Sequence, residues 1–290
     1  MGRHLPVTVN QNCSLSDLPN MNFAEWFNII FFSVISVFAL VITLPRNQRI
    51  LACTIGSFGI AVCLSMFYSP AFLSEKASLN LRNWIPVMLI LIAYHQSGQL
   101  FSKPRPKFQA LLLKLDNYLL EGFYRGPEVV RSNFFISGLF EISYLICYPL
   151  VPAALGVLTL IDLQDRADEF WIVVLPSTYV CYALIPFFPA FPPRLLDAVG
   201  MMPVPNSRIR AINIWILRHA SIQANTFPSA HVAACTSASL VLLRHDVWMG
   251  TCFLCVSLSI AASAVIRRYH YTADAILGIA ISFVTYLLTA

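Results

Sequence analysis

Two short segments near the carboxyl end of the chain carry residue types that could do chemistry on an anionic group. Residues 227–231 (Phe-Pro-Ser-Ala-His) open one long apolar run, and residues 267–274 (Arg-Arg-Tyr-His-Tyr-Thr-Ala-Asp) lie between two others. Each segment brings a histidine, His231 or His270, to the edge of an apolar run. Only 11% of the residues are charged, so histidines grouped with Asp274 and with arginines at such edges indicate a functional site.

His270 and Asp274 are four residues apart, which places them one turn apart on a helix that has begun by His270. A carboxylate in that position fixes the tautomer and orientation of an imidazole that acts as a nucleophile or a general base. His231 follows Ser229 and Ala230 at the start of another apolar run. Backbone N–H groups at a helix N-terminus, together with the Ser229 hydroxyl, form a site for phosphate oxygens.

These residue types suggest phosphoryl transfer. We expect His270 to attack phosphorus while Asp274 stabilises the imidazolium ion that forms. His231 then protonates the leaving oxygen and afterwards activates water or an acceptor alcohol.

Arginines near both histidines supply planar, bidentate donors for phosphate oxygens. The candidates are Arg194, Arg267 and Arg268. We expect no metal ion and no cofactor, because these cations take the place of a metal. Two histidines and one aspartate among arginines also make a poor zinc site, since the arginines would repel a cation.

The composition predicts an all-α, polytopic transmembrane helix bundle. The chain has 290 residues, of which 58% are hydrophobic, against roughly 45–50% in ordinary soluble domains. A soluble fold could not bury so many apolar runs of about 20 residues. We expect eight apolar segments, at residues 24–44, 50–73, 84–101, 133–161, 170–191, 227–244, 248–266 and 271–290.

Three stretches are too polar to cross a membrane. Residues 102–132 are basic, and apolar residues recur there at helical spacing, which predicts a helix at the membrane surface over about 105–131. Residues 162–169 form a short acidic loop. Residues 192–226 form a long polar loop with four arginines.

Counting membrane crossings places the candidate residues on one face. The fifth segment ends at Arg194, and the sixth starts near Phe227 on the same side. The seventh returns to end near Arg267, and the eighth starts near His270. We therefore expect one cluster made of Arg194, His231, Arg267, Arg268, His270 and Asp274.

The motifs resemble those of the type 2 phosphatidic acid phosphatase (PAP2) superfamily. Residues 228–231 (Pro-Ser-Ala-His) are similar to its Pro-Ser-Gly-His motif, and residues 270–274 to its terminal His-x-x-x-Asp motif. Residues 191–194 (Phe-Pro-Pro-Arg) resemble a variant in the branch that includes inositol-phosphorylceramide-synthase-like proteins. Residues 115–120 are similar to that branch too, as are Glu141, Tyr144 and Tyr148. The resemblance covers roughly residues 84–290.

The resemblance implies a six-helix catalytic core with two extra N-terminal helices. The organisation is then a polar segment at 1–23, two transmembrane helices within 24–83 and the catalytic domain at 84–290. It implies a phosphohistidine at His270, an acid–base role for His231 and an orienting role for Asp274. The substrate would be a lipid phosphate, which is hydrolysed or transferred to an alcohol.

Two positions depart from the superfamily pattern. Ala230 replaces the usual glycine, which gives the backbone less freedom around a phosphate. Ala264 stands where many members carry a phosphate-binding arginine, so Arg267 or Arg268 must substitute; the sequence leaves open which. The superfamily's Lys-x6-Arg-Pro motif is also absent as such.

The sequence leaves open the role of Glu141 and the choice between an enzyme and a transporter. Glu141, with Tyr144 and Tyr148 three and seven residues later, forms a polar stripe that is either an accessory to the site or a helix-to-helix hydrogen bond. A non-catalytic lipid or anion transporter is the alternative to an enzyme. We find no nucleic-acid signature and expect membrane lipids as partners; the oligomeric state stays open.

The orientation in the membrane is predicted differently by two arguments. By the segment count, 14 of the 19 lysines and arginines fall on the catalytic side, and the positive-inside rule would make that side cytoplasmic. The resemblance implies a periplasmic or lumenal site, in a bacterial inner membrane or a eukaryotic endomembrane. We favour the latter, because several of these cations could serve phosphate binding.

Overall fold

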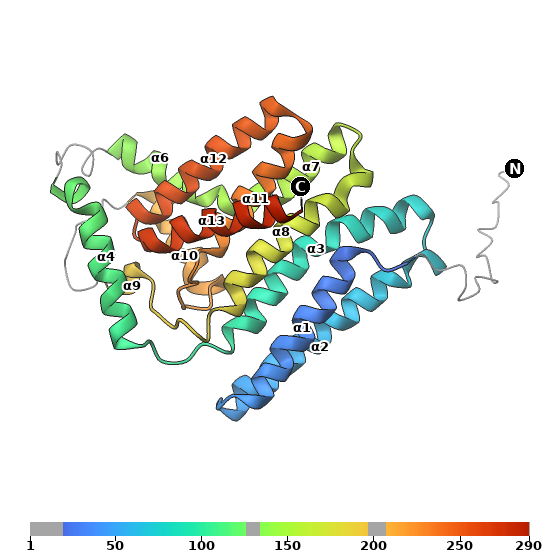
Figure 1. The fold of residues 1–290 in the computed structure, drawn as a ribbon, viewed down its shortest axis with the longest axis horizontal. Coiled ribbons are helices and arrows are strands. Elements are labelled where there is room, and N and C mark those ends of the chain that lie inside the picture. Colours follow the sequence, from blue (N-terminus) through green and yellow to red (C-terminus); the bar gives the residue numbers. More distant parts are fainter. Residues whose placement is uncertain (1–19, 126–133, 197–206, 290) are drawn as a thin grey trace, which may run out of the picture.

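The computed structural model describes residues 20–125, 134–196 and 207–289. All regular secondary structure within these ranges is helical (Figure 1), which confirms the predicted all-α bundle. Most of the predicted polar segment 1–23, and residues 126–131 of the predicted surface helix, lie outside the described residues.

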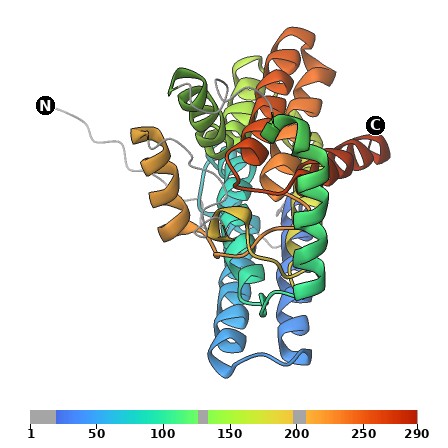
Figure 2. The same ribbon diagram turned by 90° about the vertical axis from the view of Figure 1, so that its left-hand side faces the viewer.

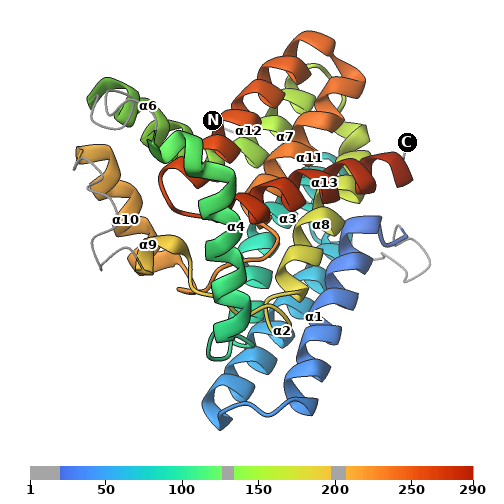
Figure 3. The same ribbon diagram turned by 60° about the vertical axis from the view of Figure 1, so that its left-hand side comes forward.

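Three long helices form the N-terminal part of the bundle. They are α1 (Phe23–Val41), α2 (Arg46–Phe67) and α3 (Glu75–Gly98), with a short 3-10 turn, η2 (Ser69–Ala71), between the last two. α1 and α2 lie side by side (Figures 1 and 3). Gln96 of α3 donates hydrogen bonds to the carbonyl oxygens of Phe32 and Ala52, so one buried amide links all three helices.

α3 begins nine residues before the predicted segment 84–101. Ser74 caps it by accepting a hydrogen bond from the Ala77 N–H at 3.4 Å, and Arg82 lies within it. The Arg82 charge is tolerated there because its Nε lies 2.6 Å from a carboxylate oxygen of the buried Glu25 on α1. The predicted domain boundary at residue 84 falls inside α3, and the domain division itself stays a prediction.

The predicted single segment 133–161 is wrong in one respect, because it is two helices. α6 (Phe134–Leu145) and α7 (Cys147–Leu160) meet at a bend of 57°. Pro149 explains the bend: it has no N–H to donate to the Leu145 carbonyl oxygen, and its ring clashes with that carbonyl group. α6 can therefore pack against α12 while α7 packs against α11.

α11 (Ala230–His245) is the central helix of the bundle. It packs against α7, α8 (Ala167–Ala183), α12 (Val247–Ile266) and α13 (Thr272–Leu288), and η3 (Gln164–Arg166) precedes α8. Nearly every residue of α11 from Ala230 to Leu242 is buried, and most are alanine, serine, threonine or cysteine. Small side chains allow helix backbones to approach closely.

The prediction that residues 192–226 form a loop is also wrong in part. This stretch contains α9 (Pro193–Leu196) and α10 (Arg208–Ala220). α10 forms because Ser207 caps it, accepting from the Arg210 N–H at 3.1 Å, and because Asn213 and Leu217, four residues apart, give it a buried face. Figure 2 shows α10 at one edge of the molecule, with α9 between it and α4 (Pro106–Arg125).

Several helices are long and apolar enough to cross a membrane, which indicates an integral membrane protein. Among the described residues these are α1, α2, α3 and α12, and the bent pair α6–α7 makes a fifth if it counts as one span. α8, α11 and α13 have 17, 16 and 17 residues, near the lower limit of about 17 for a helical span. α4 agrees with the predicted helix at 105–131 over its described part; its place at the membrane surface stays a prediction.

Gly278 sets how closely α13 approaches the start of α11. A methyl group at this position would lie 2.7 Å from the backbone carbonyl oxygen of Ser229. We expect Gly278→Ala to lower the free energy of unfolding by about 1–3 kcal/mol, because backbone must move to relieve the overlap. Thermal unfolding in detergent micelles measures the effect. Gly138→Ala on α6, where the new methyl meets nothing within 4 Å, is the control; equal Tm values for both variants would contradict this packing.

Candidate active site

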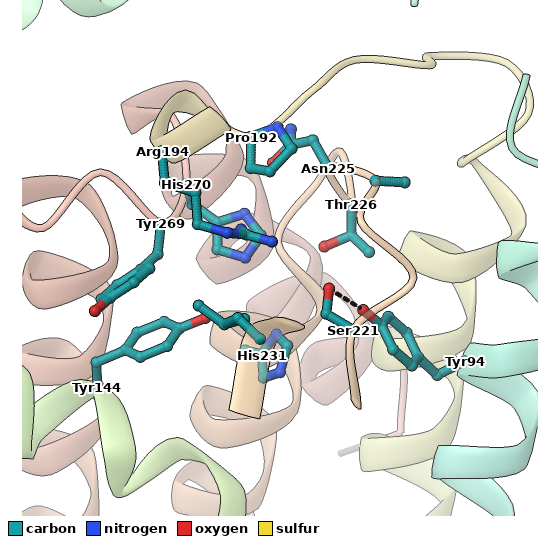
Figure 4. A pocket seen from close by; sticks show the side chains of 12 residues that line it. Tyr94, Tyr144, Pro192, Arg194, Ser221, Asn225, Thr226, His231, Tyr269 and His270 are labelled. Atoms are coloured by element: carbon teal, nitrogen blue, oxygen red, sulfur yellow. Dashed lines mark hydrogen bonds between the residues drawn. The ribbon is translucent and has the colours of Figure 1, made fainter. Parts of the chain in front are cut away.

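Segments that are far apart in sequence line one pocket (Figure 4). Its lining residues are Tyr94 from α3, Tyr144 from α6, Pro192, Arg194, Leu217 from α10, Ser221, Ala224, Asn225, Thr226, His231, Tyr269 and His270. The two histidines lie between Tyr144 and Tyr269 on one side and Tyr94 and Ser221 on the other. The predicted convergence of Arg194, His231 and His270 is therefore present in the structure.

His270 and Asp274 form the expected pair, with Nδ1 and Oδ2 separated by 3.2 Å. The reason differs from the expected one, because α13 begins at Thr272 and His270 lies before it. Asp274 is in the first turn of α13 and reaches back to accept a hydrogen bond from the Tyr271 N–H at 3.0 Å. The pair is thus formed by helix capping rather than by a shared helix face, and it engages Nδ1 of His270 rather than Nε2.

His231 lies in the first turn of α11, and its ring centroid is 6.1 Å from that of His270. Both rings line the same pocket, so they are placed to act on one group bound there. The His231 ring packs edge-on against Tyr148, with centroids 5.8 Å apart. Its Nδ1 is buried and has no hydrogen-bond partner among the described residues.

Ser229 and Ala230 start α11 but do not line the pocket. The Ser229 hydroxyl accepts from the Val232 N–H at 3.5 Å, and the Ala230 N–H donates to the Thr226 hydroxyl at 3.4 Å. Two groups of the expected phosphate site are thus used in capping the helix. Their role in phosphate binding stays a prediction, and Thr226 lines the pocket in their place.

Arg194 is the arginine that lines the pocket. Its backbone N–H donates to the Arg268 carbonyl oxygen at 2.9 Å, which ties the α9 segment to the α12–α13 connection. Its guanidinium Nη2 is buried, and within the described ranges it has no hydrogen-bond partner. A buried, unpartnered donor of this kind is costly, and a bound anion would satisfy it.

Arg267 and Arg268 are both held by buried carboxylates and do not line the pocket. Arg267 Nε lies 2.6 Å from Glu141 Oε1, and Arg268 Nη1 lies 2.8 Å from Asp116 Oδ2. Asp116, on α4, also accepts two hydrogen bonds from Thr272, each at 2.7 Å. These contacts hold the α12–α13 connection in place; phosphate binding by either arginine stays a prediction.

Glu141 is the centre of a buried polar cluster beside the pocket. Its carboxylate accepts hydrogen bonds from Arg267, from Arg210 at 2.9 Å, from the Tyr269 hydroxyl at 2.6 Å and from Asn213 at 2.8 Å. The cluster joins α6 and α10 to the α12–α13 connection, as in the helix-to-helix alternative. It also positions the pocket, because Tyr269 stacks on Tyr144 with centroids 3.9 Å apart.

Five residues on which the site depends were not among the predicted site residues, although Asp116 lies in the stretch 115–120 that resembles the family branch: Asn225, Asp116, Arg210, Asn213 and Tyr269. Asn225 donates to Asp274 from a segment 49 residues away. Nothing in one sequence marks such a partner. The available signal was a carboxylate on the apolar stripe of a predicted amphipathic helix, as with Asp116, which lies four residues from both Leu112 and Leu120.

A comparison with protein-family models agrees with the motifs. A family model of the PAP2 superfamily matches residues 111–288, which is more than half of the chain and contains all the predicted site residues. The chain belongs to the PAP2 superfamily. No curated protein and no solved structure matches it. Membership of the PAP2 superfamily supports a phosphatase-type activity on lipid phosphates in general terms.

Glu141 offers a test of the buried cluster. We expect Glu141→Ala to destabilise this PAP2 protein by about 3–5 kcal/mol, because it leaves Arg267 buried without its carboxylate. Arg166→Ala removes the exposed ion pair with Glu169 and should cost under about 1 kcal/mol. Thermal unfolding of both variants in micelles gives the comparison, and a Glu141→Ala Tm equal to that of Arg166→Ala would contradict the cluster.

Proposed function

We propose that this protein is a membrane lipid-phosphate phosphatase or phosphotransferase that cleaves a phosphoester through a phosphohistidine, without a metal ion. One observation carries the proposal: two histidines, 6.1 Å apart between ring centroids, line one pocket together with Arg194, whose Nη2 has no hydrogen-bond partner among the described residues. Asp274 lies beside Nδ1 of His270. We therefore assign His270 as the nucleophile and His231 as the acid.

In the first step, Nε2 of His270 attacks phosphorus and the bond from phosphorus to the ester oxygen breaks. His231 gives its proton to the leaving oxygen, and Asp274 stabilises the positive charge on His270. Arg194 binds the non-bridging oxygens, whose charge it stabilises through the transition state.

In the second step, an oxygen nucleophile attacks the phosphohistidine and the bond from nitrogen to phosphorus breaks. His231, now unprotonated, takes the proton of that nucleophile. Water gives free phosphate, whereas an alcohol gives a new phosphoester. Ser229, Ala230, Arg267 and Arg268 are the remaining predicted phosphate contacts; in this scheme we assign the main contact to Arg194.

Transfer to an alcohol, as in enzymes of the inositol-phosphorylceramide synthase type, is the second candidate function. It is favoured by the position of the Phe-Pro-Pro-Arg segment, since Pro192 and Arg194 line the pocket. Three residues with hydroxyl groups, Tyr94, Ser221 and Thr226, also line it. A non-catalytic transporter is less favoured. We place the site on the periplasmic or lumenal side, following the resemblance.

The two histidines carry the central prediction. We expect His270→Ala and His231→Ala to lower turnover of lipid phosphates on the order of 10⁴-fold or more, because each removes a group that forms or breaks a bond. The assay follows free phosphate and new phosphoester, with and without an acceptor such as inositol. His245→Ala, at the opposite end of α11, is the matched control. Wild-type turnover in His270→Ala would rule out this mechanism.

Arg194 carries a second prediction. We expect Arg194→Ala to reduce kcat about 10²–10³-fold, the usual loss when one donor to a developing charge is removed. Arg218→Ala, which removes an exposed arginine of α10, should leave kcat unchanged. Steady-state kinetics on lipid phosphate in mixed micelles measures both. If Arg267→Ala or Arg268→Ala lowered kcat with unchanged Tm while Arg194→Ala did not, the phosphate contact would have to be reassigned.

A further inference from the structure

Asn225 lies in the segment between α10 and α11 and is fully buried, although its side chain is polar. Its backbone N–H donates to the Ala190 carbonyl oxygen at 2.9 Å. Its side-chain Nδ2 donates to Asp274 Oδ2 at 2.8 Å. Asn225 also lines the pocket (Figure 4), so it contacts both the candidate site and the carboxylate that pairs with His270.

The hydrogen bonds to the Asp274 carboxylate converge on one oxygen. Oδ2 lies 2.8 Å from Asn225 Nδ2, 3.0 Å from the Tyr271 backbone nitrogen and 3.2 Å from His270 Nδ1. Oδ1 is buried and, in the part of the chain that the structure describes, has no partner. The hydrogen bond from the Tyr271 backbone fixes the position of one carboxylate oxygen but does not fix the orientation of the carboxylate plane. The second donor, Asn225, comes from another segment and restricts that orientation.

The chemistry of the carboxamide determines what this contact can do. An ionised carboxylate only accepts hydrogen bonds, so the amide must present Nδ2 to Asp274. Donors on one oxygen favour the ionised carboxylate. The ionised carboxylate in turn holds a proton on His270 Nδ1, which leaves Nε2 unprotonated and able to attack.

We infer that Asn225 is a positioning residue for phosphoryl transfer, which holds Asp274 in the orientation that keeps His270 Nε2 nucleophilic. The inference rests on the proposed function, since it has meaning only if His270 is the nucleophile. Asn225 itself touches no reacting atom in this scheme. It acts through Asp274, and its removal should slow formation of the phosphohistidine more than it weakens substrate binding.

A purely structural role for Asn225 makes a different prediction. Asn28 of α1 is an equally buried asparagine, bonded to the Ala24 carbonyl oxygen and to the Tyr179 hydroxyl. Its removal should lower stability without acting through Asp274. Effects of independent sites combine additively in free energy, whereas residues that act on one group do not. A double-mutant cycle therefore separates the two roles.

The experiment uses the full-length protein in detergent micelles, with labelled phosphatidic acid as the probe and enzyme in excess. The single-turnover rate is measured for the wild type, Asn225→Ala, Asp274→Asn and the double variant, and kcat and KM are measured at steady state. We expect Asn225→Ala to lower kcat on the order of 10- to 100-fold, as for other residues that orient a reacting group from behind. KM should change less than about twofold, and the double variant should react no more slowly than Asp274→Asn.

Two further variants serve as controls. Asn28→Ala should leave kcat unchanged even if it lowers Tm, and Asn225→Leu, of similar size, replaces Asn225→Ala if that variant does not fold. Two results would overturn the inference while the proposed function stands. One is an unchanged kcat in Asn225→Ala. The other is a rate reduction in the double variant equal to the product of the reductions in the two single variants. A wild type that cleaves lipid phosphates without forming a phosphohistidine, or that cleaves none of them, would overturn both.

Discussion

The site depends on one junction, where the first turns of α11 and α13 meet. The Ser229 N–H donates to the Asp274 carbonyl oxygen at 2.9 Å, so the two helix starts are joined backbone to backbone. His231 follows Ser229 by two residues, and His270 precedes Asp274 by four. Because both histidines are attached so near this junction, their separation is set by backbone geometry rather than by flexible side chains. Gly278 permits the close approach, since a methyl group there would overlap the Ser229 carbonyl oxygen.

A second constraint divides the arginines between structure and chemistry. A buried cation requires a partner, because the loss of its hydration costs several kcal/mol. Arg267 and Arg268 have such partners in Glu141 and Asp116. Arg194 lines the pocket, which Arg267 and Arg268 do not. Among the described residues Nη2 of Arg194 has no hydrogen-bond partner; Nη2 of Arg267 has none there either, but Arg267 lies outside the pocket lining. Among the described residues that line the pocket, Arg194 is therefore the cation available to a phosphate, and the paired arginines hold the connection that carries His270.

The sequence was sufficient for the parts of the site that depend on local spacing and on the order of segments. The convergence of Arg194, His231 and His270 followed from where apolar runs end. The bend at Pro149 was missed, because a proline alone does not mark a bend: Pro86, Pro152 and Pro176 lie inside helices that continue past them. Contacts such as Asp116 to Arg268 span 152 residues, and a single sequence has no pattern that pairs them.

The apolar residues of α4 are consistent both with a helix at the membrane surface and with a helix packed against the rest of the protein. The predicted surface helix does expose Leu111, Leu115 and Leu119, as a helix beside lipid would. A neighbouring face buries Leu112 and Asp116, and Asp116 accepts hydrogen bonds from Arg268 and Thr272. Amphipathic periodicity cannot separate a face in lipid from a face in protein, because both are apolar. The polar residue on the buried face separates them: a carboxylate there requires partners, and its partners belong to the connection that presents His270 to the pocket.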